Sequence, residues 1–350
     1  MPLNIAVIGL GRMGKRHVHT LLYRVPRAKV VAVCTTDPHE IEWAQHNPEY
    51  TEFGIAIYDD YDKLLSSQSN LQAVWVSTST DVHAMQTLKA IEKGLHVLCE
   101  KPLSTDLTEA QSVVTAANAH PELKIMAGFS RRFDASYRDA AVKIQRGAIG
   151  TPFLVRSNTC DLKDTSGFFV RYASRNGGIF VDCAIHDIDL TLWYLDNPVP
   201  KACWAVGSLQ AHPELAAAGD VDNAVGMVQF WGGKMAYFYC SRTQAHGHDV
   251  LTEITGTEGK VMVNVIPRAN AVVLADKGGL RHEVQAEYWQ RFEEAFAVEA
   301  NEFVDAVLGD RRVPVSLETG LVVMKIGRAL QDALLSGEVV RFDEGGERLN

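Results

Sequence analysis

The chain has 350 residues, of which 47% are hydrophobic and 22% are charged, a composition that excludes a largely disordered protein and allows two domains of ordinary size. The net charge of −9 leaves no general excess of Lys and Arg to neutralise phosphates, so we expect no nucleic-acid partner. No apolar stretch reaches the ~18 residues of a membrane span, and Met1-Pro2-Leu3 leads into a strand without a basic leader, so we expect a cytoplasmic protein with no membrane partner.

The first predicted strand covers residues 4–8 and is followed by the glycine motif GLGRMG at residues 9–14 and then by a helix. In this motif Gly9 permits a tight turn, Gly11 lets the backbone approach a pyrophosphate, and Gly14 lets the helix pack closely on the strand. The start of the helix offers N–H groups and a positive dipole end. Because strand, turn and helix occur in this order, the segment predicts a dinucleotide site; a purely structural glycine turn is the alternative.

Strands and helices then alternate along the first 128 residues. The predicted strands are residues 29–33, 55–58, 73–76, 96–99 and 124–127, and the predicted helices are residues 38–45, 61–66, 83–93 and 104–118. Apolar strands separated by helices are typical of a parallel sheet that is covered on both faces. The pattern predicts an α/β Rossmann domain with a doubly wound parallel sheet over residues 1–128.

The pattern changes near residues 147–152. Beyond this point the predicted elements are strands with alternating polarity at residues 224–230 and 235–239, joined by a Gly232-Gly233 turn, and helices at residues 288–308 and 317–336. We predict a C-terminal α+β domain over residues 129–350, with an open, largely antiparallel sheet, that binds substrate and mediates oligomerisation. The last helix of this domain can pack back on the first domain.

The tripeptide Glu100-Lys101-Pro102 follows directly after the predicted strand at residues 96–99. Ligands of doubly wound sheets bind outside the carboxyl ends of the strands. The residues that follow three strands should therefore lie on one rim beside the glycine motif: Ser77-Thr78, Glu100-Lys101 and Gly128-Phe129. A lysine on this rim can touch both cofactor and substrate, whereas the alternative is an ordinary surface lysine before a proline.

A second polar cluster occurs in residues 177–190. Helical periodicity from about Ile179 to Leu195 predicts one helix that places Asp182 and His186 one turn apart on the same face. A carboxylate beside an imidazole suits proton abstraction, because the acid can hold the ring and tune its pKa. A structural hydrogen bond and half of a metal site are the alternatives.

Six cysteines are scattered along the chain without a CxxC pair: Cys34, Cys99, Cys160, Cys183, Cys203 and Cys240. This spacing does not indicate a zinc or redox site. We therefore predict reduced, mostly buried thiols and no metal.

Taken together, these motifs resemble the glucose-fructose oxidoreductase, inositol dehydrogenase and MocA (Gfo/Idh/MocA) superfamily over nearly the whole chain. The motifs are the glycine motif, the EKP tripeptide, residues 128–134 (GFSRRFD), the GGxxxDxxxHDID stretch at residues 177–189, and the tail from residues 291–296 to 314–316. Within the superfamily the RRFD sequence and the pattern of Asp182, His186, Asp187 and Asp189 are most similar to inositol 2-dehydrogenases.

The resemblance implies an NAD(P)-dependent oxidoreductase that oxidises a secondary hydroxyl of a cyclic polyol or pyranose sugar to the ketone or lactone. It implies that His186 is the base, that Lys101 positions the hydroxyl and stabilises alkoxide charge, and that Asp182 orients His186. The implied cofactor-binding residues are Gly9, Gly11, Arg12, Met13, Gly14, Thr35, Thr36, Ser77, Thr78, His83, Glu100 and Lys101. The implied substrate-binding residues are Lys101, Arg131, Asp182, His186 and His246.

Two departures from the family pattern concern specificity. Thr35 stands where NAD-type members carry an acidic residue for the ribose, and Asp37 could lie one turn too late to replace it, so the choice between NAD and NADP stays open. Arg12 could bind a 2′-phosphate or could be a solvated arginine. His246 and His248 replace two tyrosines of a segment that lines the sugar pocket, which leaves the polyol undetermined.

The resemblance leaves two alternative functions open, because relatives with this fold perform them. One is a glycoside hydrolase that uses NAD for transient oxidation, and the other is a non-catalytic dinucleotide or sugar sensor. Sensors of this kind can lose the catalytic lysine and histidine, whereas Lys101 and His186 are both present here. Apolar residues on the outer face of the antiparallel sheet predict a homodimer. The resemblance implies that such a dimer pairs again into a homotetramer.

Overall fold

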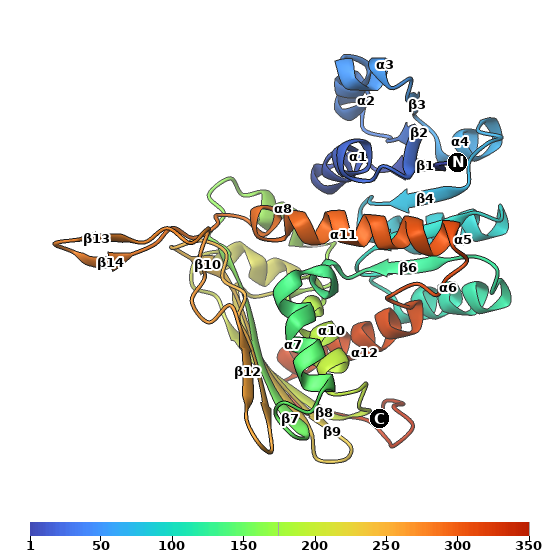
Figure 1. Ribbon diagram of the computed structural model, residues 1–350. Helices are drawn as coiled ribbons and strands as arrows, with labels where there is room; N and C mark the ends of the chain where they lie inside the picture. The colour runs from blue at the N-terminus through green and yellow to red at the C-terminus, as the bar shows by residue number, and fades with distance from the viewer. Residues whose placement is uncertain (174, 350) are drawn as a thin grey trace. The chain divides into compact units, whose positions relative to one another are not determined.

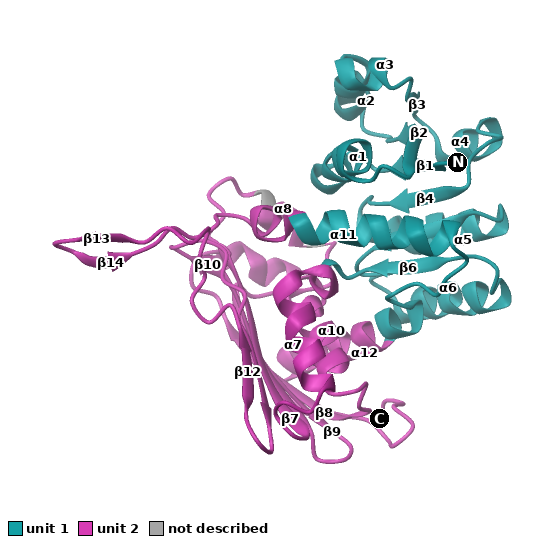
Figure 2. Cartoon of the chain, viewed as in Figure 1, with its two compact units in different colours: residues 1–130, 294–321 teal, residues 131–293, 322–350 magenta. Residues whose placement is uncertain are grey.

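The computed structural model describes residues 1–173 and 175–349, which form two compact units (Figures 1 and 2). Unit 1 contains residues 1–130 and 294–321, and unit 2 contains residues 131–293 and 322–350. The sequence predicted a second domain over residues 129–350 with a last helix that can pack back on the first domain, whereas the structure assigns residues 294–321 to unit 1. The reason is aromatic packing: in helix α11 (Tyr288–Leu308), Phe303 packs edge-on against Trp75 at 5.9 Å between ring centroids.

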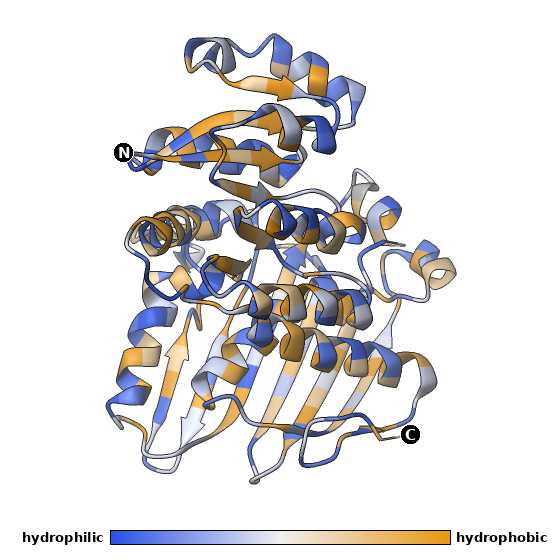
Figure 3. Cartoon of the chain, turned by 90° about the vertical axis from the view of Figure 1, so that its right-hand side faces the viewer, coloured by the Kyte–Doolittle hydropathy of each residue, from blue (hydrophilic) through white to orange (hydrophobic). Residues whose placement is uncertain are grey.

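Unit 1 contains a six-stranded sheet in which every paired strand is parallel to its neighbour. The strand order is β3-β2-β1-β4-β5-β6. The strands are β1 (Leu3–Ile8), β2 (Ala28–Cys34), β3 (Ala56–Tyr58), β4 (Ala73–Val76), β5 (His96–Glu100) and β6 (Ile125–Gly128). The four central strands are almost wholly buried, and Figure 3 shows this sheet as hydrophobic along most of its length. The predicted doubly wound parallel sheet is confirmed, and its order reverses between β1 and β4, where such sheets bind dinucleotides.

Helices connect these parallel strands. They are α1 (Arg12–Arg24), α2 (Pro38–Gln45), α3 (Pro48–Glu52), α4 (Tyr61–Ser67), η1 (Thr80–Val82), α5 (His83–Glu92) and α6 (Leu107–Ala119). Aspartates start several of them, because Asp37, Asp60 and Asp106 accept hydrogen bonds from backbone N–H groups in the first turns of α2, α4 and α6. The first helix differs, since its N-cap residue is Gly11 and no side-chain cap bond forms there.

Unit 2 contains a seven-stranded sheet in the order β12-β11-β7-β10-β9-β8-β15. The strands are β7 (Pro152–Leu162), β8 (Pro200–Ser208), β9 (Asn223–Phe230), β10 (Met235–Gln244), β11 (Thr252–Gly256), β12 (Lys260–Val263) and β15 (Val340–Arg341). All neighbours are antiparallel except β7 and β10, which are parallel. The predicted largely antiparallel sheet is therefore confirmed. A separate hairpin of β13 (Leu274–Asp276) and β14 (Gly279–Arg281) extends from this unit (Figure 1).

Helices pack against one face of the seven-stranded sheet. The helices of unit 2 include α7 (Ala135–Gln145), α8 (Phe168–Ala173), α9 (Ile179–Asp182), α10 (Ile185–Tyr194), η3 (Pro213–Ala218) and most of α12 (Leu317–Ser336), while η2 (Ser130–Phe133) leads into them. A Cβ on Gly226 of β9 would lie 2.6 Å from Phe180 and 3.1 Å from Leu330, so α9 and α12 contact the sheet closely.

The opposite face of that sheet carries partly exposed apolar side chains. Trp204, Met227 and Tyr237 lie side by side on β8, β9 and β10, because Trp204 pairs with Met227 and Met227 pairs with Tyr237. Trp204 is 37% exposed and Met227 is 42% exposed.

No helix within residues 1–173 and 175–349 combines the length and the hydropathy that a membrane span requires.

Candidate functional site

The glycine motif forms a tight turn between β1 and α1. Gly9 has a φ of +91°, and its N–H donates to Cys34 O at 2.7 Å. A Cβ at Gly9 would lie 2.7 Å from Ser77 O, so only glycine fits this turn. The Ser77 hydroxyl donates to Ile8 O at 3.1 Å and lies 3.3 Å from Gly9 O, which fixes the loop to the end of β4.

Gly14 and Gly11 have different surroundings. A Cβ at Gly14 would lie 1.9 Å from Gly9 O, which confirms that Gly14 permits the close packing of α1 on the loop. At Gly11 a Cβ would meet only Glu40 Oε1, at 3.7 Å. The backbone at Gly11 is therefore open next to an uncapped helix start, as a pyrophosphate site requires.

An acidic side chain that sequence reasoning missed, Glu40, lies beside the residue that follows β2. Thr35 is buried, and its Oγ1 donates to Glu40 Oε2 at 2.5 Å. Asp37 is the N-cap of α2, where its Oδ1 accepts from His39 N at 2.8 Å. Glu40 is therefore the third residue of α2, a position from which an acidic side chain reaches back toward the residues before the helix. The spacing of Asp37 and Glu40 was the sequence signal for this arrangement, while Thr36 is exposed.

The EKP tripeptide starts at the last residue of β5. Glu100 Oε1 lies 2.7 Å from His17 Nε2, and Glu100 Oε2 accepts from the Lys101 N–H at 3.2 Å. Burial of Glu100 opposes its ionisation, but the hydrogen bond with His17 and the charges of His17 and Lys101 outweigh burial and hold the pKa of Glu100 below its usual value. Glu100 is therefore an ionised, buried side chain directly before Lys101.

His83 links the ends of β4 and β5. Its Nδ1 lies 2.8 Å from Pro102 O, and its Nε2 lies 3.2 Å from Thr78 O. Burial lowers the pKa of His83, which favours a neutral ring. The Thr78 hydroxyl donates to Gln86 Oε1 at 2.7 Å. Thr78, His83 and Pro102 are thus held together on the predicted rim.

A buried carboxyl group, Glu299 of α11, belongs to the same region of unit 1. Glu299 is 0% exposed, and neither carboxyl oxygen has a hydrogen-bond partner in the part of the chain that the structure describes. Burial, together with the charge of Glu100, raises the pKa of Glu299 well above its usual value. Burial of Glu299 therefore favours its neutral form, and the sequence pattern gave no sign of this residue.

Asp182 and His186 lie on two short helices in unit 2, not on the single helix that the periodicity predicted. Asp182 is the last residue of α9, and His186 is the second residue of α10. Between them the hydrogen-bond pattern changes, because the Ala184 N–H bonds to Ile179 O, five residues earlier, at 3.2 Å. The prediction of one continuous helix was wrong, since apolar periodicity does not record such a local change in winding.

Asp182 accepts a hydrogen bond from a buried arginine. Arg242 Nη2 lies 2.7 Å from Asp182 Oδ2, and Arg242 Nη1 lies 3.2 Å from Asp220 Oδ2. Asn176 Nδ2 lies 3.4 Å from the same Asp182 oxygen. The guanidinium stacks over Phe169 at 3.7 Å, and its side chain is only 5% exposed. Arg242, which sequence reasoning did not identify, therefore fixes the Asp182 carboxylate.

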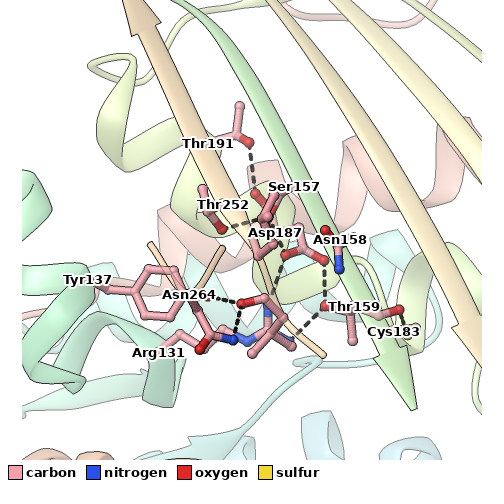
Figure 4. Close-up of polar contacts among 12 residues, drawn as sticks. Arg131, Tyr137, Ser157, Asn158, Thr159, Cys183, Asp187, Thr191, Thr252 and Asn264 are labelled. Atoms are coloured by element: carbon pink, nitrogen blue, oxygen red, sulfur yellow. Dashed lines mark hydrogen bonds and ion pairs between the residues drawn. The ribbon is translucent and has the colours of Figure 1, made fainter. Parts of the chain in front are cut away.

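A network around Asp187 supports the start of α10 (Figure 4). Asp187 is fully buried and accepts from Arg131 Nη1 at 2.8 Å, Ser157 Oγ at 2.6 Å and Thr159 Oγ1 at 2.6 Å. Arg131 Nη2 also donates to Thr159 Oγ1 at 2.7 Å. Arg131 is thus engaged with the residue that follows His186 in the chain.

The two histidines of the His-x-His sequence have different environments. The side chain of His246 is 50% exposed and lies 3.6 Å from Asp249. His248 is buried, and its Nδ1 lies 2.9 Å from Asp161 Oδ1. Within the described ranges no group of three or more His, Cys, Asp or Glu side chains is arranged to hold a metal. All six cysteines are free and buried.

The predicted site residues thus fall into two sets. Unit 1 holds the glycine motif with Arg12 and Met13, Thr35, Thr36, Ser77, Thr78, His83, Glu100 and Lys101, and unit 2 holds Arg131, Asp182, His186 and His246. Within unit 1 the structure brings the glycine motif, Ser77 and Glu40 close together. Within unit 2 it places Asp182 and His186 four residues apart across a helix junction.

Inositol dehydrogenases are among the solved structures to which the chain is similar. The scyllo-inositol dehydrogenase from Lactobacillus casei with bound NAD(H) and scyllo-inositol has a TM-score of 0.91 and 31% identity, covering 97% of this chain and 99% of that one. Myo-inositol 2-dehydrogenase from Lactobacillus plantarum has a TM-score of 0.91 and 32% identity, covering 98% and 100%. The scyllo-inositol 2-dehydrogenase (NAD(+)) of Bacillus subtilis is 30% identical over 340 residues, 97% of this chain and 96% of that protein.

Two family models match consecutive parts of the chain. Residues 3–129 match the oxidoreductase family with an NAD-binding Rossmann fold, and residues 137–262 match the GFO/IDH/MocA C-terminal domain. The strand order of unit 1 and the mixed sheet of unit 2 agree with both matches. The chain therefore belongs to the Gfo/Idh/MocA family of oxidoreductases.

Proposed function

We propose that this protein is an NAD-dependent dehydrogenase that oxidises a secondary hydroxyl of a cyclic polyol, an inositol, to the ketone. The observation that carries the proposal is the full-length similarity to a dehydrogenase solved with NAD(H) and scyllo-inositol, combined with the presence of Lys101, Asp182 and His186. The proposal keeps an open choice between inositol isomers, since the relatives are named for both scyllo- and myo-inositol.

The residues of unit 1 fit a dinucleotide. Gly11 leaves its backbone open, α1 begins without a side-chain cap, and Ser77 holds the loop in place. We propose that the pyrophosphate lies against Gly11 and the first turn of α1. When bound, NAD supplies the acceptor for the hydride that leaves the hydroxyl-bearing carbon.

Side chains of the protein remove the hydroxyl proton in the same reaction and stabilise the charge that develops. We assign His186 as the base that removes the hydroxyl proton and Lys101 as the cation that stabilises the developing alkoxide charge. Asp182 contributes a carboxylate that orients the base and binds the polyol. Oxidation releases one hydride and one proton from each secondary alcohol, so turnover produces one NADH and one ketone.

Supporting side chains hold these groups in place. Arg242 and Asn176 fix the Asp182 carboxylate, while Glu100, paired with His17, accepts from the backbone of Lys101. Arg131 donates hydrogen bonds to Asp187 and Thr159, so we propose that it acts on substrate binding through α10. His246 is exposed on its loop, where it is available to a polyol hydroxyl.

The experiment that tests the function is an assay of the purified chain with scyllo-, myo- and chiro-inositol and with aldoses, using NAD and following the absorbance of the NADH that forms. Stoichiometric ketone and NADH support the dehydrogenase. Release of a sugar from a glycoside without net NADH would instead identify a glycoside hydrolase, and binding without turnover would identify a sensor. The dehydrogenase names of the relatives favour the first outcome.

We also propose that the protein assembles through the outer face of the seven-stranded sheet. Trp204, Met227 and Met235 are 37%, 42% and 45% exposed on that face, and contiguous exposed apolar groups usually mark interfaces. Two copies packed face to face bury these side chains, and such a dimer can pair again into a tetramer.

A further inference from the structure

The chain lacks an acidic residue at the position where related NAD-binding sites recognise the adenosine ribose. In Rossmann folds this residue follows the second strand and accepts hydrogen bonds from the ribose 2′-hydroxyl. Here β2 ends at Cys34 and is followed by Thr35, which cannot supply a negative charge. From the sequence alone the choice between NAD and NADP therefore stayed open.

The structure supplies that charge from a different element. Glu40 is the third residue of α2, and its two carboxyl oxygens reach toward two parts of the expected cofactor site. Oε2 accepts from Thr35 Oγ1 at 2.5 Å, and Oε1 is the nearest atom to a Cβ built on Gly11, at 3.7 Å. The carboxylate thus lies between the end of β2 and the second glycine of the phosphate-binding motif.

The hydrogen bond also determines what Thr35 can do. A threonine hydroxyl has one proton, and here that proton is donated to Glu40. The Thr35 oxygen lies 3.3 Å from the Asp37 N–H, from which it accepts. Thr35 therefore has no proton left for a 2′-phosphate, and its role is to hold the Glu40 carboxylate in place.

Lys15, a basic residue in the first turn of α1, contacts an aromatic ring of α2. Lys15 Nζ lies over the Trp43 ring, 4.1 Å from its centroid. A 2′-phosphate carries up to two negative charges and would lie against the fixed Glu40 carboxylate. A ribose 2′-hydroxyl instead donates to a carboxylate oxygen.

We propose that Glu40, presented by Thr35, is the residue that selects NAD over NADP in this protein. The inference rests on the proposed dinucleotide site in unit 1. It differs from the usual arrangement because the acid comes from the first turn of α2 and needs a threonine as its support.

Direct binding of NADH and NADPH to the full chain, without polyol, tests the proposal. We compare the parent, Glu40→Gln and the control Glu42→Gln by fluorescence titration. Gln keeps the size of the side chain and removes its charge, and Glu42 is an exposed acid on the same helix. The parent should prefer NADH, Glu40→Gln should shift the ratio of the two dissociation constants toward NADPH by about tenfold or more, and Glu42→Gln should leave it unchanged.

A second variant tests the support. Thr35→Val removes the hydrogen bond to Glu40 but keeps the negative charge, so it should weaken NADH severalfold while NADPH stays weak. The proposal is overturned if the parent binds NADPH as tightly as NADH, or if Glu40→Gln and Glu42→Gln give the same ratio. These outcomes are independent of the polyol: NADH preference without turnover contradicts only the dehydrogenase, and turnover with an unchanged ratio contradicts only the role of Glu40.

Discussion

His17 and Glu100 are 83 residues apart in the chain, yet His17 Nε2 lies 2.7 Å from Glu100 Oε1 in the core of unit 1. The side chains are 1% and 11% exposed, so water screens the pair little. Glu100 is also the residue before Lys101 and accepts from its backbone N–H. The pair therefore connects α1, which follows the glycine motif, with the strand end that carries the proposed catalytic lysine.

We predict that His17→Ala destabilises the protein strongly. The substitution leaves the Glu100 carboxylate buried without its histidine partner, and breaking a buried pair from one side typically costs about 3–5 kcal/mol. His19→Ala is the matched control, because His19 is an exposed residue on the same helix. Urea unfolding measures both variants. Equal, small losses would show that the His17–Glu100 contact does not support the fold.

Glu299 makes the stability depend on pH. In the folded state its raised pKa keeps the carboxyl protonated to a higher pH than in the unfolded chain, where it ionises above its ordinary value of 4.5. Above that value the unfolded state binds fewer protons than the folded state, so the unfolding free energy falls as pH rises, by at most about 1.4 kcal/mol per pH unit for one group. The loss continues until pH reaches the raised pKa.

We therefore predict that the stability advantage of Glu299→Gln over the parent grows as the pH rises above 4.5, over a range that starts at pH 5. Glutamine fills the same space and cannot ionise. Urea unfolding at four pH values, with Glu293→Gln as the exposed control on the same helix, measures the difference. If the parent and Glu299→Gln lose stability in parallel over this range, Glu299 is not a buried neutral acid.

Two variants of the glycine motif should have different effects, one on NADH binding and the other on stability. Gly11→Val should fold, because a Cβ at Gly11 has no neighbour closer than 3.7 Å, but it should lose NADH binding because the side chain occupies the pyrophosphate position. Gly14→Ala should lower the melting temperature, because its Cβ would lie 1.9 Å from Gly9 O. Thermal unfolding and NADH titration separate the two effects. Normal NADH binding by Gly11→Val would contradict the placement of the pyrophosphate.

Much of the architecture could be predicted from local pattern. The parallel strands were visible as apolar runs between helices, and the β9–β10 hairpin was visible in Gly232 and Gly233, which both have positive φ. The assignment of residues 294–321 to unit 1 could not be predicted in this way, since it depends on contacts such as that of Phe303 with Trp75. Sequence periodicity reports which face of a helix is buried but not the surface against which it packs.

The site shows the same division. The glycine motif and the EKP tripeptide are each a run of consecutive residues, so both could be recognised in the sequence. The contact of Glu40 with Thr35 depends on the start of α2, where the third side chain of the helix turns back toward β2. The contact of Arg242 with Asp182 depends on the pairing of β10 with the rest of its sheet. Side chains that act through a partner distant in sequence were the ones that sequence reasoning missed.

For catalysis we predict that Lys101→Ala and His186→Ala each lower kcat by about 10²–10⁴-fold, the range that a positioned proton-transfer group contributes. The melting temperature should change little in both variants, and NADH binding should change little in His186→Ala, which separates a chemical defect from a folding defect. His120→Ala is the control, because His120 is exposed at the end of α6. Activity of His186→Ala within a few-fold of the parent would remove the proposed base.

The last prediction concerns assembly through the seven-stranded sheet. Trp204→Asp together with Met227→Asp places two charges on neighbouring strands of the exposed face, where the two residues are paired in register. Burying these charges in an interface without partners is unfavourable, so the variant should dissociate. Light scattering should give a multiple of 38.5 kDa for the parent and a value near one chain for the variant. Val142→Asp, an exposed apolar position on α7, is the control and should keep the parent's mass. A parent that is already monomeric in dilute solution would contradict the proposed interface.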